Sequence, residues 1–162
     1  MTVRTGFGYD SHRFAPGRKL VLGGVEIPFE KGLDGHSDAD ALIHAIIDSI
    51  LGALGAGDIG AHFPDTDAAY RGISSLVLLE KTLLLARRRG FSVAQVDSTV
   101  IAQAPRLAPH IEAMRASLAR ALGTAEENVS IKAKTNEGMG FTGRGEGICA
   151  FAVCLLEETG GR

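Results

Sequence analysis

The glycines of this chain are unevenly distributed, and their distribution constrains the fold more than any other feature of the sequence. The 162 residues include 21 glycines, about twice the usual share, and most of them lie within residues 6–60 and 138–147. A glycine cluster indicates backbone that turns sharply or closely approaches a neighbour. No three-residue period is present, which excludes a collagen helix, and five prolines are too few for a low-complexity Pro/Gly chain. We therefore expect a globular protein with glycine-rich functional loops.

Length and charge limit the classes of protein that remain. A chain of 162 residues that is 45% hydrophobic and 22% charged suits one domain over residues 1–162, with a core over about 3–156 and a short flexible C-terminal tail. The net charge of −2 argues against a nucleic-acid partner. The basic run over residues 87–89 is better explained as a solvated helix end, where cations interact favourably with the helix dipole.

The termini and cysteines indicate a compartment. Residues 1–4 lead into a glycine-rich stretch rather than an apolar segment, so we expect no signal peptide. No apolar run approaches the roughly 18 residues of a membrane helix, so we expect no membrane partner. Cys149 and Cys154 are five residues apart in an expected strand, which directs them to opposite faces and prevents a disulfide between them. A cytoplasmic protein with reduced thiols is the expectation.

The N-terminal residues alternate in the manner of a strand. We expect Val3, Thr5, Phe7 and Tyr9 to form its core face, while the opposite face is polar and opened by glycines. A hairpin is expected over residues 19–29, turning at residues 23–24.

A helix is predicted from about residue 37, with Ser37 as its cap. Its apolar stripe comprises Ile43, Ile46, Ile47, Ile50, Leu51 and Leu54. Asp40, His44 and Asp48 are expected to form a column on the opposite, polar side.

The remaining elements alternate less regularly. Helices are predicted over residues 74–89 and 109–123, each ended by a glycine, and a capping box is predicted to start a short helical turn at residues 124–127. Strands are predicted over residues 95–102, 129–134 and 147–156. Because a regular parallel βαβ alternation is absent, we expect an α+β fold, a single-domain two-layer sandwich of a mixed sheet and helices.

The first chemical pattern is a possible metal site. Asp10 and His12 are two residues apart on one expected strand face, and His44 lies on the polar side of the first helix. Two imidazoles and one carboxylate are typical of a catalytic zinc site with an open fourth position, and Asp48 is expected to orient His44. The alternative is a chance Asp-x-His on a strand and a surface histidine, and the spacing leaves both open.

Nucleotide-binding motifs are weak or missing. Gly6 and Gly8 begin a Rossmann-like pattern, but Ser11 occupies the third glycine position and no helix is expected there. No P-loop Gly-Lys-Ser or Gly-Lys-Thr occurs.

Two further segments suggest binding of a phosphorylated ligand. His36 and Ser37 lie at an expected helix start, where free N–H groups attract phosphate, although Ser37 could serve only as a cap. Residues 57–67 carry three carboxylates among glycine and proline; Asp58 could accept a sugar hydroxyl, but ordinary Asx turns explain the same pattern.

The C-terminal glycine-rich segment is the third. Residues 132–147 combine backbone N–H groups with Lys134, Arg144 and the Thr135 hydroxyl, while Glu137 could hold a hard divalent cation. A mobile hairpin loop would explain the glycines but not this charged and hydroxyl set. The three segments and the possible zinc site together favour metal-assisted chemistry on a phosphorylated small molecule.

Four ordered motifs make the chain recognisable. The segments Gly6–His12, Gly35–Asp40, Gly57–Asp67 and Gly140–Gly147 closely resemble, in order and spacing, the 2-C-methyl-D-erythritol 2,4-cyclodiphosphate synthase family of the non-mevalonate isoprenoid pathway. The resemblance covers about residues 3–156. It implies an enzyme that converts 4-diphosphocytidyl-2-C-methyl-D-erythritol 2-phosphate to the 2,4-cyclodiphosphate and CMP. It also implies a lyase-type intramolecular phosphoryl transfer that consumes no water.

The resemblance also implies cofactors and roles. Asp10, His12 and His44 would bind Zn²⁺, and Glu137 would hold Mg²⁺ or Mn²⁺ with the substrate phosphates. His36 and Thr135 would be catalytic. The substrate-binding set would comprise Asp10, Ser11, His12, His36, Ser37, Asp58, Ile59, Gly60, Phe63, Pro64, Asp65, Thr66, Asp67, Ala102, Gln103, Ala104, Pro105, Arg106, Leu107, Ala108, Lys134, Thr135, Asn136, Glu137, Phe141 and Arg144, with residues 102–108 around the cytosine.

Assembly follows from the same resemblance, which implies a homotrimer with active sites between subunits. Lys134 departs from the family, which often has a small hydroxyl residue there; a lysine could serve instead as a point charge for phosphate. From the residues alone, a zinc-dependent phosphohydrolase with a bound hydroxide and a metal-dependent nucleotide-binding module remain as alternatives.

Overall fold

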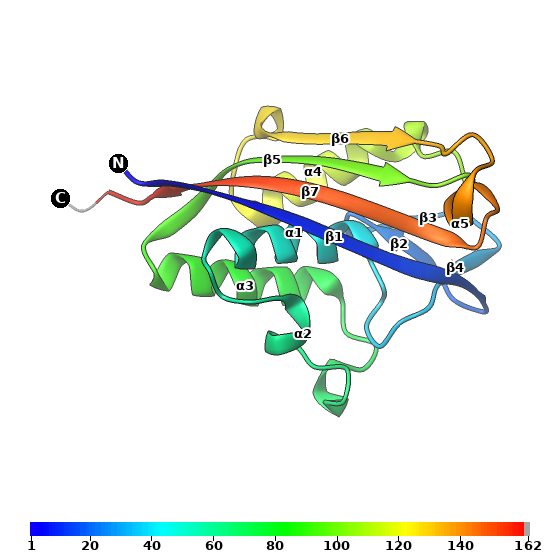
Figure 1. Cartoon of the computed structure of the whole chain (residues 1–162), viewed down its shortest axis with the longest axis horizontal. Helices are drawn as coiled ribbons and strands as arrows, with labels where there is room; N and C mark the ends of the chain where they lie inside the picture. The colour runs from blue at the N-terminus through cyan, green and yellow to red at the C-terminus, as the bar shows by residue number, and fades with distance from the viewer. Residues whose placement is uncertain (161–162) are drawn as a thin grey trace.

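The computed structural model describes residues 1–160, and the chain folds into one mixed sheet covered by helices (Figure 1). The five-stranded sheet has the order β4-β1-β7-β5-β6, and β2 and β3 form a separate hairpin. The strands are β1 (Val3–Pro16), β2 (Leu20–Leu22), β3 (Val25–Ile27), β4 (Lys31–Leu33), β5 (Phe91–Ile101), β6 (Val129–Lys134) and β7 (Gly147–Glu158). The helices are α1 (Ala41–Ala53), α2 (Ile59–His62), α3 (Ser75–Arg88), α4 (Ile111–Leu122) and α5 (Gly140–Gly143), with short 3₁₀ turns at Ala68–Tyr70, Ala108–His110 and Glu126–Asn128.

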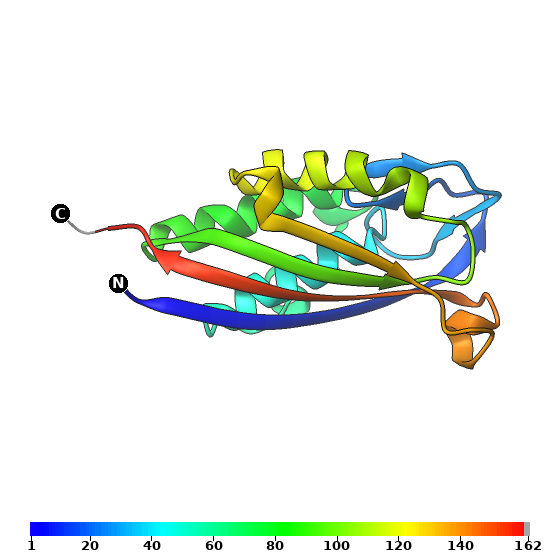
Figure 2. The same cartoon turned by 90° about the horizontal axis from the view of Figure 1, so that it is seen from above.

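The sheet is mixed, as expected for an α+β fold. β7 pairs antiparallel with β1 and β5, whereas β5 and β6 are parallel and α4 lies in the connection between them. Figure 2 shows α3 and α4 on one side of the sheet, so the molecule has two layers. Among the described residues, the opposite face of the sheet carries only the short helix α5, at one end of the strands.

The predicted faces of the first strand are reversed. The glycine face of β1 packs against α1: a Cβ on Gly8 would lie 1.8 Å from the Ala45 carbonyl oxygen, and one on Gly6 would lie 1.9 Å from that of Ser49. Only glycine permits this approach. The face predicted as core points to solvent, with Phe7 62% exposed and Tyr9 43% exposed.

Helix α1 is buried nearly all round, so the predicted polar column was wrong. His44 and Asp40 are buried and Asp48 is half-buried, because α1 packs against both the sheet and α3. The helix begins at Ala41 and its cap is Asp40 rather than Ser37. The Asp40 carboxylate accepts hydrogen bonds from the backbone N–H groups of Ile43, Gly23 and Gly24. Asp40 therefore ties the β2–β3 turn to the start of α1.

Most other predicted elements are confirmed. Ser74 caps α3, Gly90 follows it with a φ of +79°, and Gly123 ends α4 in the left-handed conformation. Strand β5 begins four residues earlier than predicted, and the capping box at residues 124–127 does not form: the Thr124 hydroxyl instead accepts from the Asn128 amide.

The ends of the chain agree in part with expectation. Cys149 and Cys154 are both buried and free, as predicted. β7 continues to Glu158, two residues beyond the expected core. The end of the predicted flexible tail, residues 161–162, lies outside the described residues.

Candidate active site

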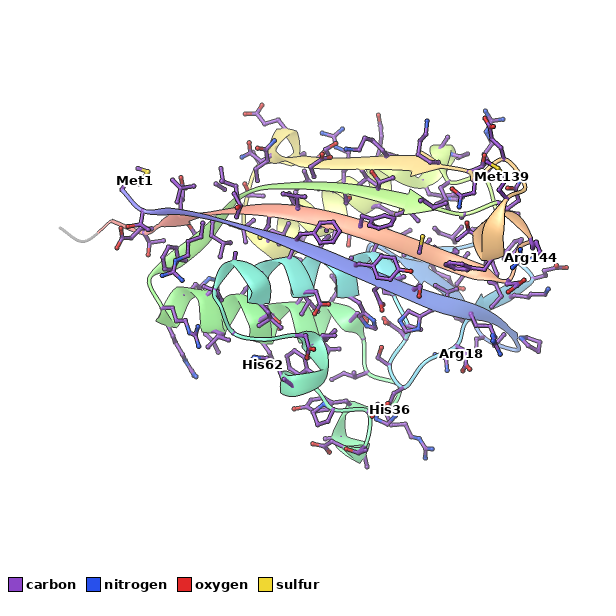
Figure 3. The ribbon with its side chains drawn as sticks, viewed as in Figure 1. Met1, Arg18, His36, His62, Met139 and Arg144 are labelled. Carbon is purple, nitrogen blue, oxygen red and sulfur yellow. The ribbon has the colours of Figure 1, made fainter. Side chains whose placement is uncertain are left out.

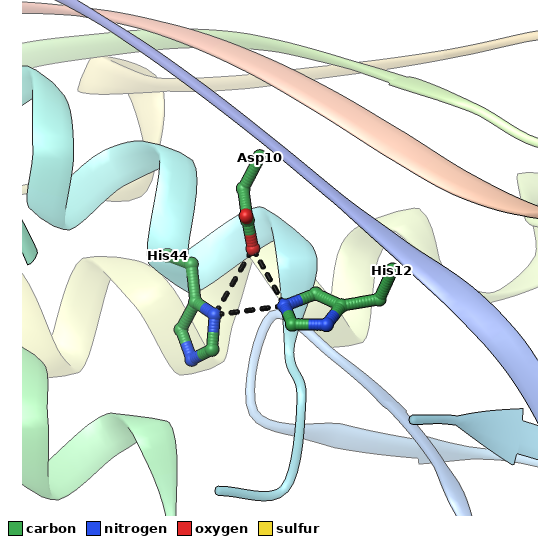
Figure 4. Close-up of side chains that lie close together, drawn as sticks. All are labelled: Asp10, His12 and His44. Carbon is green, nitrogen blue, oxygen red and sulfur yellow. Dashed lines mark hydrogen bonds and ion pairs between the residues drawn. The ribbon is translucent and has the colours of Figure 1, made fainter. Parts of the chain in front are cut away.

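The three predicted zinc ligands converge in space (Figure 4). Asp10 and His12 extend from the face of β1 that packs on α1, and His44 extends from the first turn of α1. Asp10 Oδ2 lies 2.7 Å from His12 Nε2 and 3.0 Å from His44 Nδ1, and the two ring nitrogens are 3.1 Å apart. These separations are close to the roughly 3.3 Å between ligand atoms of a tetrahedral zinc site with bonds of about 2.0–2.1 Å.

Hydrogen bonds outside the cluster determine which ring nitrogens face it. His12 Nδ1 is 2.7 Å from the Asp34 carbonyl oxygen, which can only accept, so a proton stays on Nδ1 and a metal-bound His12 would offer its Nε2 lone pair on the side of Asp10 and His44. A carboxylate and imidazole lone pairs are the donor set that zinc prefers. The residues present therefore fit a zinc ion.

The charges within the cluster stabilise the ionised carboxylate. Burial alone would raise the pKa of Asp10, but hydrogen bonds and charge from His12 and His44 lower it to about 2. Burial would likewise lower the pKa of His12, but its hydrogen bond to Asp10 raises it above the usual value. The cluster is thus a preformed anionic ligand flanked by two imidazoles.

Asp48 does not orient His44, contrary to expectation. Its carboxylate accepts from the Ile59 N–H at 2.8 Å and so positions the start of α2. The His44 Nε2 atom instead lies 2.8 Å from the Ser75 Oγ and 3.2 Å from the Ser37 Oγ. These serines come from the N-terminus of α3 and the loop before α1.

A cavity of about 520 Å³ opens directly beside the cluster. Among the predicted site residues, those that line it with the cluster are His36, Ser37, Ile59, Gly60, Phe63, Pro64, Asp65 and Thr66. The structure thus brings together the cluster and two of the loops predicted to bind the ligand.

Two predicted ligand-binding carboxylates also act as caps. Asp58 caps α2 and accepts from the Ala61 N–H, and Asp67 caps the 3₁₀ turn at Ala68–Tyr70. Local backbone capping, the alternative to ligand binding for this loop, therefore occurs at both positions. Only one oxygen of Asp58 is used in its cap, so the other remains available to a ligand.

The predicted base-binding residues lie around a different cavity. A cavity of about 480 Å³ is lined by Ala102, Gln103, Pro105, Arg106, Leu107, Ala108, Ala133, Lys134 and Thr135. Among residues 1–160, the two cavities have no lining residue in common. His36 and Thr135, both predicted to be catalytic, therefore belong to separate cavities within one chain.

The glycine-rich loop extends this second region. The Gly138 N–H donates to Gln103 Oε1 at 3.2 Å, and the Asn136 amide donates to the Thr142 hydroxyl at 2.8 Å. Glu137 adopts a positive φ of 52°, and its side chain is exposed. Figure 3 shows Met139 and Arg144 of this loop far from His36, at another end of the molecule.

Two predicted substrate-binding residues line a third cavity. Ser11 and Phe141 line a smaller cavity of about 300 Å³ together with His12. Arg144 is paired with Glu146 through its Nε atom at 2.6 Å.

The sequence did not reveal several residues of the site. Tyr70 and Leu78 line the first cavity, and Arg18 donates to the carbonyl oxygens of Gly35 and Ser37. Ser75 contacts His44 directly. None of these residues belongs to a local pattern, because each reaches the site only through tertiary packing.

None of the helices in the described part of the chain has the length and apolar character needed to cross a membrane.

Comparison with known proteins gives consistent matches. The YgbB family model matches residues 3–157. A 2-C-methyl-D-erythritol 2,4-cyclodiphosphate synthase of Laribacter hongkongensis is 60% identical over 158 residues, covering 98% of each chain. A solved structure of a synthase of this name with CDP bound is 40% identical with a TM-score of 0.88, covering 95% of this chain and 100% of that one.

A longer protein contains the same fold. The bifunctional IspDF of Campylobacter jejuni matches 97% of this chain with a TM-score of 0.93 and 39% identity, and the chain spans 42% of that protein. The length and identity of these matches show that the chain belongs to the YgbB family and is similar throughout to 2-C-methyl-D-erythritol 2,4-cyclodiphosphate synthases.

Proposed function

We propose that this protein converts 4-diphosphocytidyl-2-C-methyl-D-erythritol 2-phosphate to 2-C-methyl-D-erythritol 2,4-cyclodiphosphate and CMP. One observation carries the proposal: the Asp10–His12–His44 cluster opens into the cavity that also contains His36, Ser37 and the loop over residues 59–66. A relative that is 60% identical over 158 residues is named as a synthase of this product, which supports the proposal.

The reaction balances without water. An oxygen of the 2-phosphate bonds to the β-phosphorus of the diphosphate, the bond from that phosphorus to the CMP oxygen breaks, and CMP leaves with the electron pair. Because nucleophile and electrophile belong to one molecule, orientation supplies much of the rate. No base is required, since the attacking phosphate oxygen is already anionic near neutral pH.

Three residues would hold a zinc ion on the cavity wall. Asp10 Oδ2, His12 Nε2 and His44 Nδ1 are its proposed ligands. When bound there, zinc supplies a Lewis acid that withdraws charge from a phosphate oxygen.

The loop residues would orient the rest of the substrate. The Ser37 Oγ accepts from the Ala39 N–H, which leaves its own proton free to donate to phosphate. The His36 ring is positioned by the Asp67 carbonyl oxygen 2.8 Å from its Nε2 atom. We assign the free oxygen of Asp58 to a sugar hydroxyl and residues 59–66 to the methylerythritol.

The second cavity is assigned to the other end of the substrate. Backbone groups of residues 102–108 would read the cytosine, while Lys134 and Thr135 would contact phosphate. Asn136, Phe141 and Arg144 belong to the same end. Glu137, exposed on the loop, would hold Mg²⁺ or Mn²⁺ with two phosphates.

These assignments require more than one chain. Within one chain the two sets of residues line separate cavities, so we propose a homotrimer whose active sites combine the cluster of one subunit with the second cavity of its neighbour. The bare face of the sheet supports this assembly. The Phe151 ring packs there in tilted contacts against Phe7 and Tyr9, with centroid separations of 6.2 and 5.0 Å, and Val153 is 46% exposed.

Phosphorus NMR with the synthetic substrate tests the proposal directly. We expect signals of a cyclic diphosphate and of CMP in equal amounts. CMP accompanied by open-chain phosphates would instead indicate a zinc-dependent hydrolase, and an unchanged spectrum with bound nucleotide would indicate a binding module. Either result would contradict the proposed function.

A further inference from the structure

A chain of hydrogen bonds leads from the metal cluster to a carboxylate that does not line the cavity. His44 Nε2 lies 2.8 Å from the Ser75 Oγ, and the Ser75 hydroxyl is hydrogen-bonded in turn to Asp38 Oδ1. Ser75 is fully buried and Asp38 is half-buried. We call this chain the Asp38–Ser75–His44 relay.

The acceptors in the relay determine the direction of each hydrogen bond. Asp38 faces three donors: the Ser75 hydroxyl, the Ser75 N–H at 3.0 Å and the Asp40 N–H at 3.2 Å. An ionised carboxylate can only accept, so the Ser75 hydroxyl proton points to Asp38. The Oγ lone pairs of Ser75 are then left for His44 Nε2, which must donate.

This direction fixes the tautomer of His44. With its proton on Nε2, the ring presents the Nδ1 lone pair to Asp10 and His12, 3.0 and 3.1 Å away. Ser37 lies farther from Nε2, at 3.2 Å, and already accepts from the Ala39 N–H. The shorter contact to Ser75 therefore determines the orientation of the ring.

The relay also joins two segments that are distant in the sequence. Ser75 is the first residue of α3, and Asp38 lies in the loop before α1. The Asp38 N–H donates to the Ile73 carbonyl oxygen at 3.0 Å, which holds the two segments side by side. His44 is thus supported by both segments and not by its own helix alone.

We infer that Asp38 and Ser75 are positioning residues that hold His44 in the tautomer and rotation required of a zinc ligand. This inference rests on the proposed zinc site. Partners of metal-bound histidines typically affect metal affinity by 10–100-fold. The relay should therefore set the affinity for zinc without contacting zinc or substrate.

Zinc affinity of the full-length protein tests the inference. Competition with a chromophoric chelator would give the zinc dissociation constants of the wild type, Ser75→Ala and Ser74→Ala. Ser74 is the matched control, because it is the adjacent exposed serine at the same helix start and contacts only the Leu76 N–H. We expect about 10–100-fold weaker binding for Ser75→Ala and an unchanged value for Ser74→Ala.

Two results would overturn the inference: a zinc affinity of Ser75→Ala within threefold of the wild type, or an equal loss in Ser74→Ala. Thermal unfolding of the zinc-free proteins separates positioning from stability. The relay predicts that weaker binding persists at temperatures where zinc-free Ser75→Ala is fully folded. Ser75→Thr, which retains the hydroxyl, should recover most of the affinity.

A double-mutant cycle tests the link to Asp38. If Asp38 acts through Ser75, the two substitutions should not add. The Asp38→Ala/Ser75→Ala double variant should then bind zinc less than about threefold more weakly than whichever single variant binds it less tightly. Independent, multiplicative losses would contradict the relay.

A measurement on the wild type covers the case in which the variants do not fold. With histidine nitrogens labelled in the zinc-loaded protein, we expect the His44 Nε2 proton to exchange slowly and to show a nuclear Overhauser contact with Ser75. A rapidly exchanging Nε2 proton would refute the relay. Failure of the proposed zinc site is distinguishable, because His44→Ala would then leave zinc binding unchanged.

Discussion

At the scale of single residues, the metal cluster depends on His44. This residue is 8% exposed and is the only cluster member on α1, so its removal leaves a carboxylate and one imidazole among the described ligand atoms. We expect His44→Ala to lose stoichiometric zinc, measured by elemental analysis after dialysis, while circular dichroism stays near that of the wild type. His62→Ala is the control, because His62 bonds to the Ala56 carbonyl oxygen outside the cluster. Retention of zinc by His44→Ala would exclude His44 as a ligand.

A second residue-scale prediction concerns Asp40 and pH. Burial raises the pKa of Asp40 from 3.8 to about 6, although three backbone N–H groups act in the opposite direction. The folded state therefore binds this proton more tightly than the unfolded chain. The resulting stabilisation is complete below pH 3.8 and is lost as the pH rises through about 6.

Urea unfolding of the wild type and Asp40→Asn checks this prediction, because asparagine does not titrate. The free energy of unfolding of the wild type minus that of the variant should fall by about 2 kcal/mol between pH 4 and 7. A difference that is constant or that increases with pH would contradict the raised pKa.

At the scale of elements, the contact between β1 and α1 depends on glycine. A methyl group at Gly8 would lie 1.8 Å from the Ala45 carbonyl oxygen and 2.7 Å from the Ser49 nitrogen, both backbone atoms that cannot move aside locally. We expect Gly8→Ala to destabilise the fold by about 3 kcal/mol or more, since overpacking would force the strand from the helix. Thermal and urea unfolding measure the effect.

The control for this substitution is an exposed glycine on α1 that lies near β1. Gly52 is within α1, and the nearest atom to an added Cβ is the Phe7 carbonyl oxygen at 3.7 Å. Gly52→Ala should therefore stabilise the protein by about 0.5–1 kcal/mol through better helix propensity. Equal effects at Gly8 and Gly52 would show that close approach is not the reason for the glycine in β1.

The elements also show what the sequence could predict. The stop glycines predicted the ends of α3 and α4, because Gly90 and Gly123 act locally. The start of α4 was predicted two residues early, because Ala108–His110 form a 3₁₀ turn before it. The faces of β1 were reversed, because Phe7 and Tyr9 resemble core residues when no partner is considered, whereas Gly8 is what α1 requires. Alternation predicts a strand but not which of its faces is covered.

The residues of the site also divide into those that the local sequence predicts and those that it does not. Asp10, His12 and His44 were predicted from side-chain type and spacing, and the structure brings them together. The partner of His44 was predicted wrongly as Asp48, one helical turn away, because Ser75 lies 31 residues along the chain on another helix. Contacts made by tertiary packing alone leave no local pattern.

At the scale of the whole molecule, assembly is the principal prediction. The exposed ring of Phe7 belongs to an aromatic cluster on the bare sheet face, so its burial between subunits would explain the cluster. We expect Phe7→Glu to sediment as a monomer and to lose CMP release, whereas Val77→Glu, on the exposed side of α3, should remain trimeric. A wild type that sediments as a monomer at micromolar concentration would contradict the shared site. The cytoplasmic location also stays a prediction.

Subunit complementation tests most directly whether the two cavities form one active site. His44→Ala disables the cluster and Thr135→Ala disables the second cavity, so each homotrimer should release little CMP. A random 1:1 co-assembly of the two variants should recover about a quarter of wild-type activity, because random assembly in a closed ring pairs two intact halves at about one site in four. Activity no greater than the sum of the two variants, in samples shown by mass to contain mixed trimers, would contradict the shared active site.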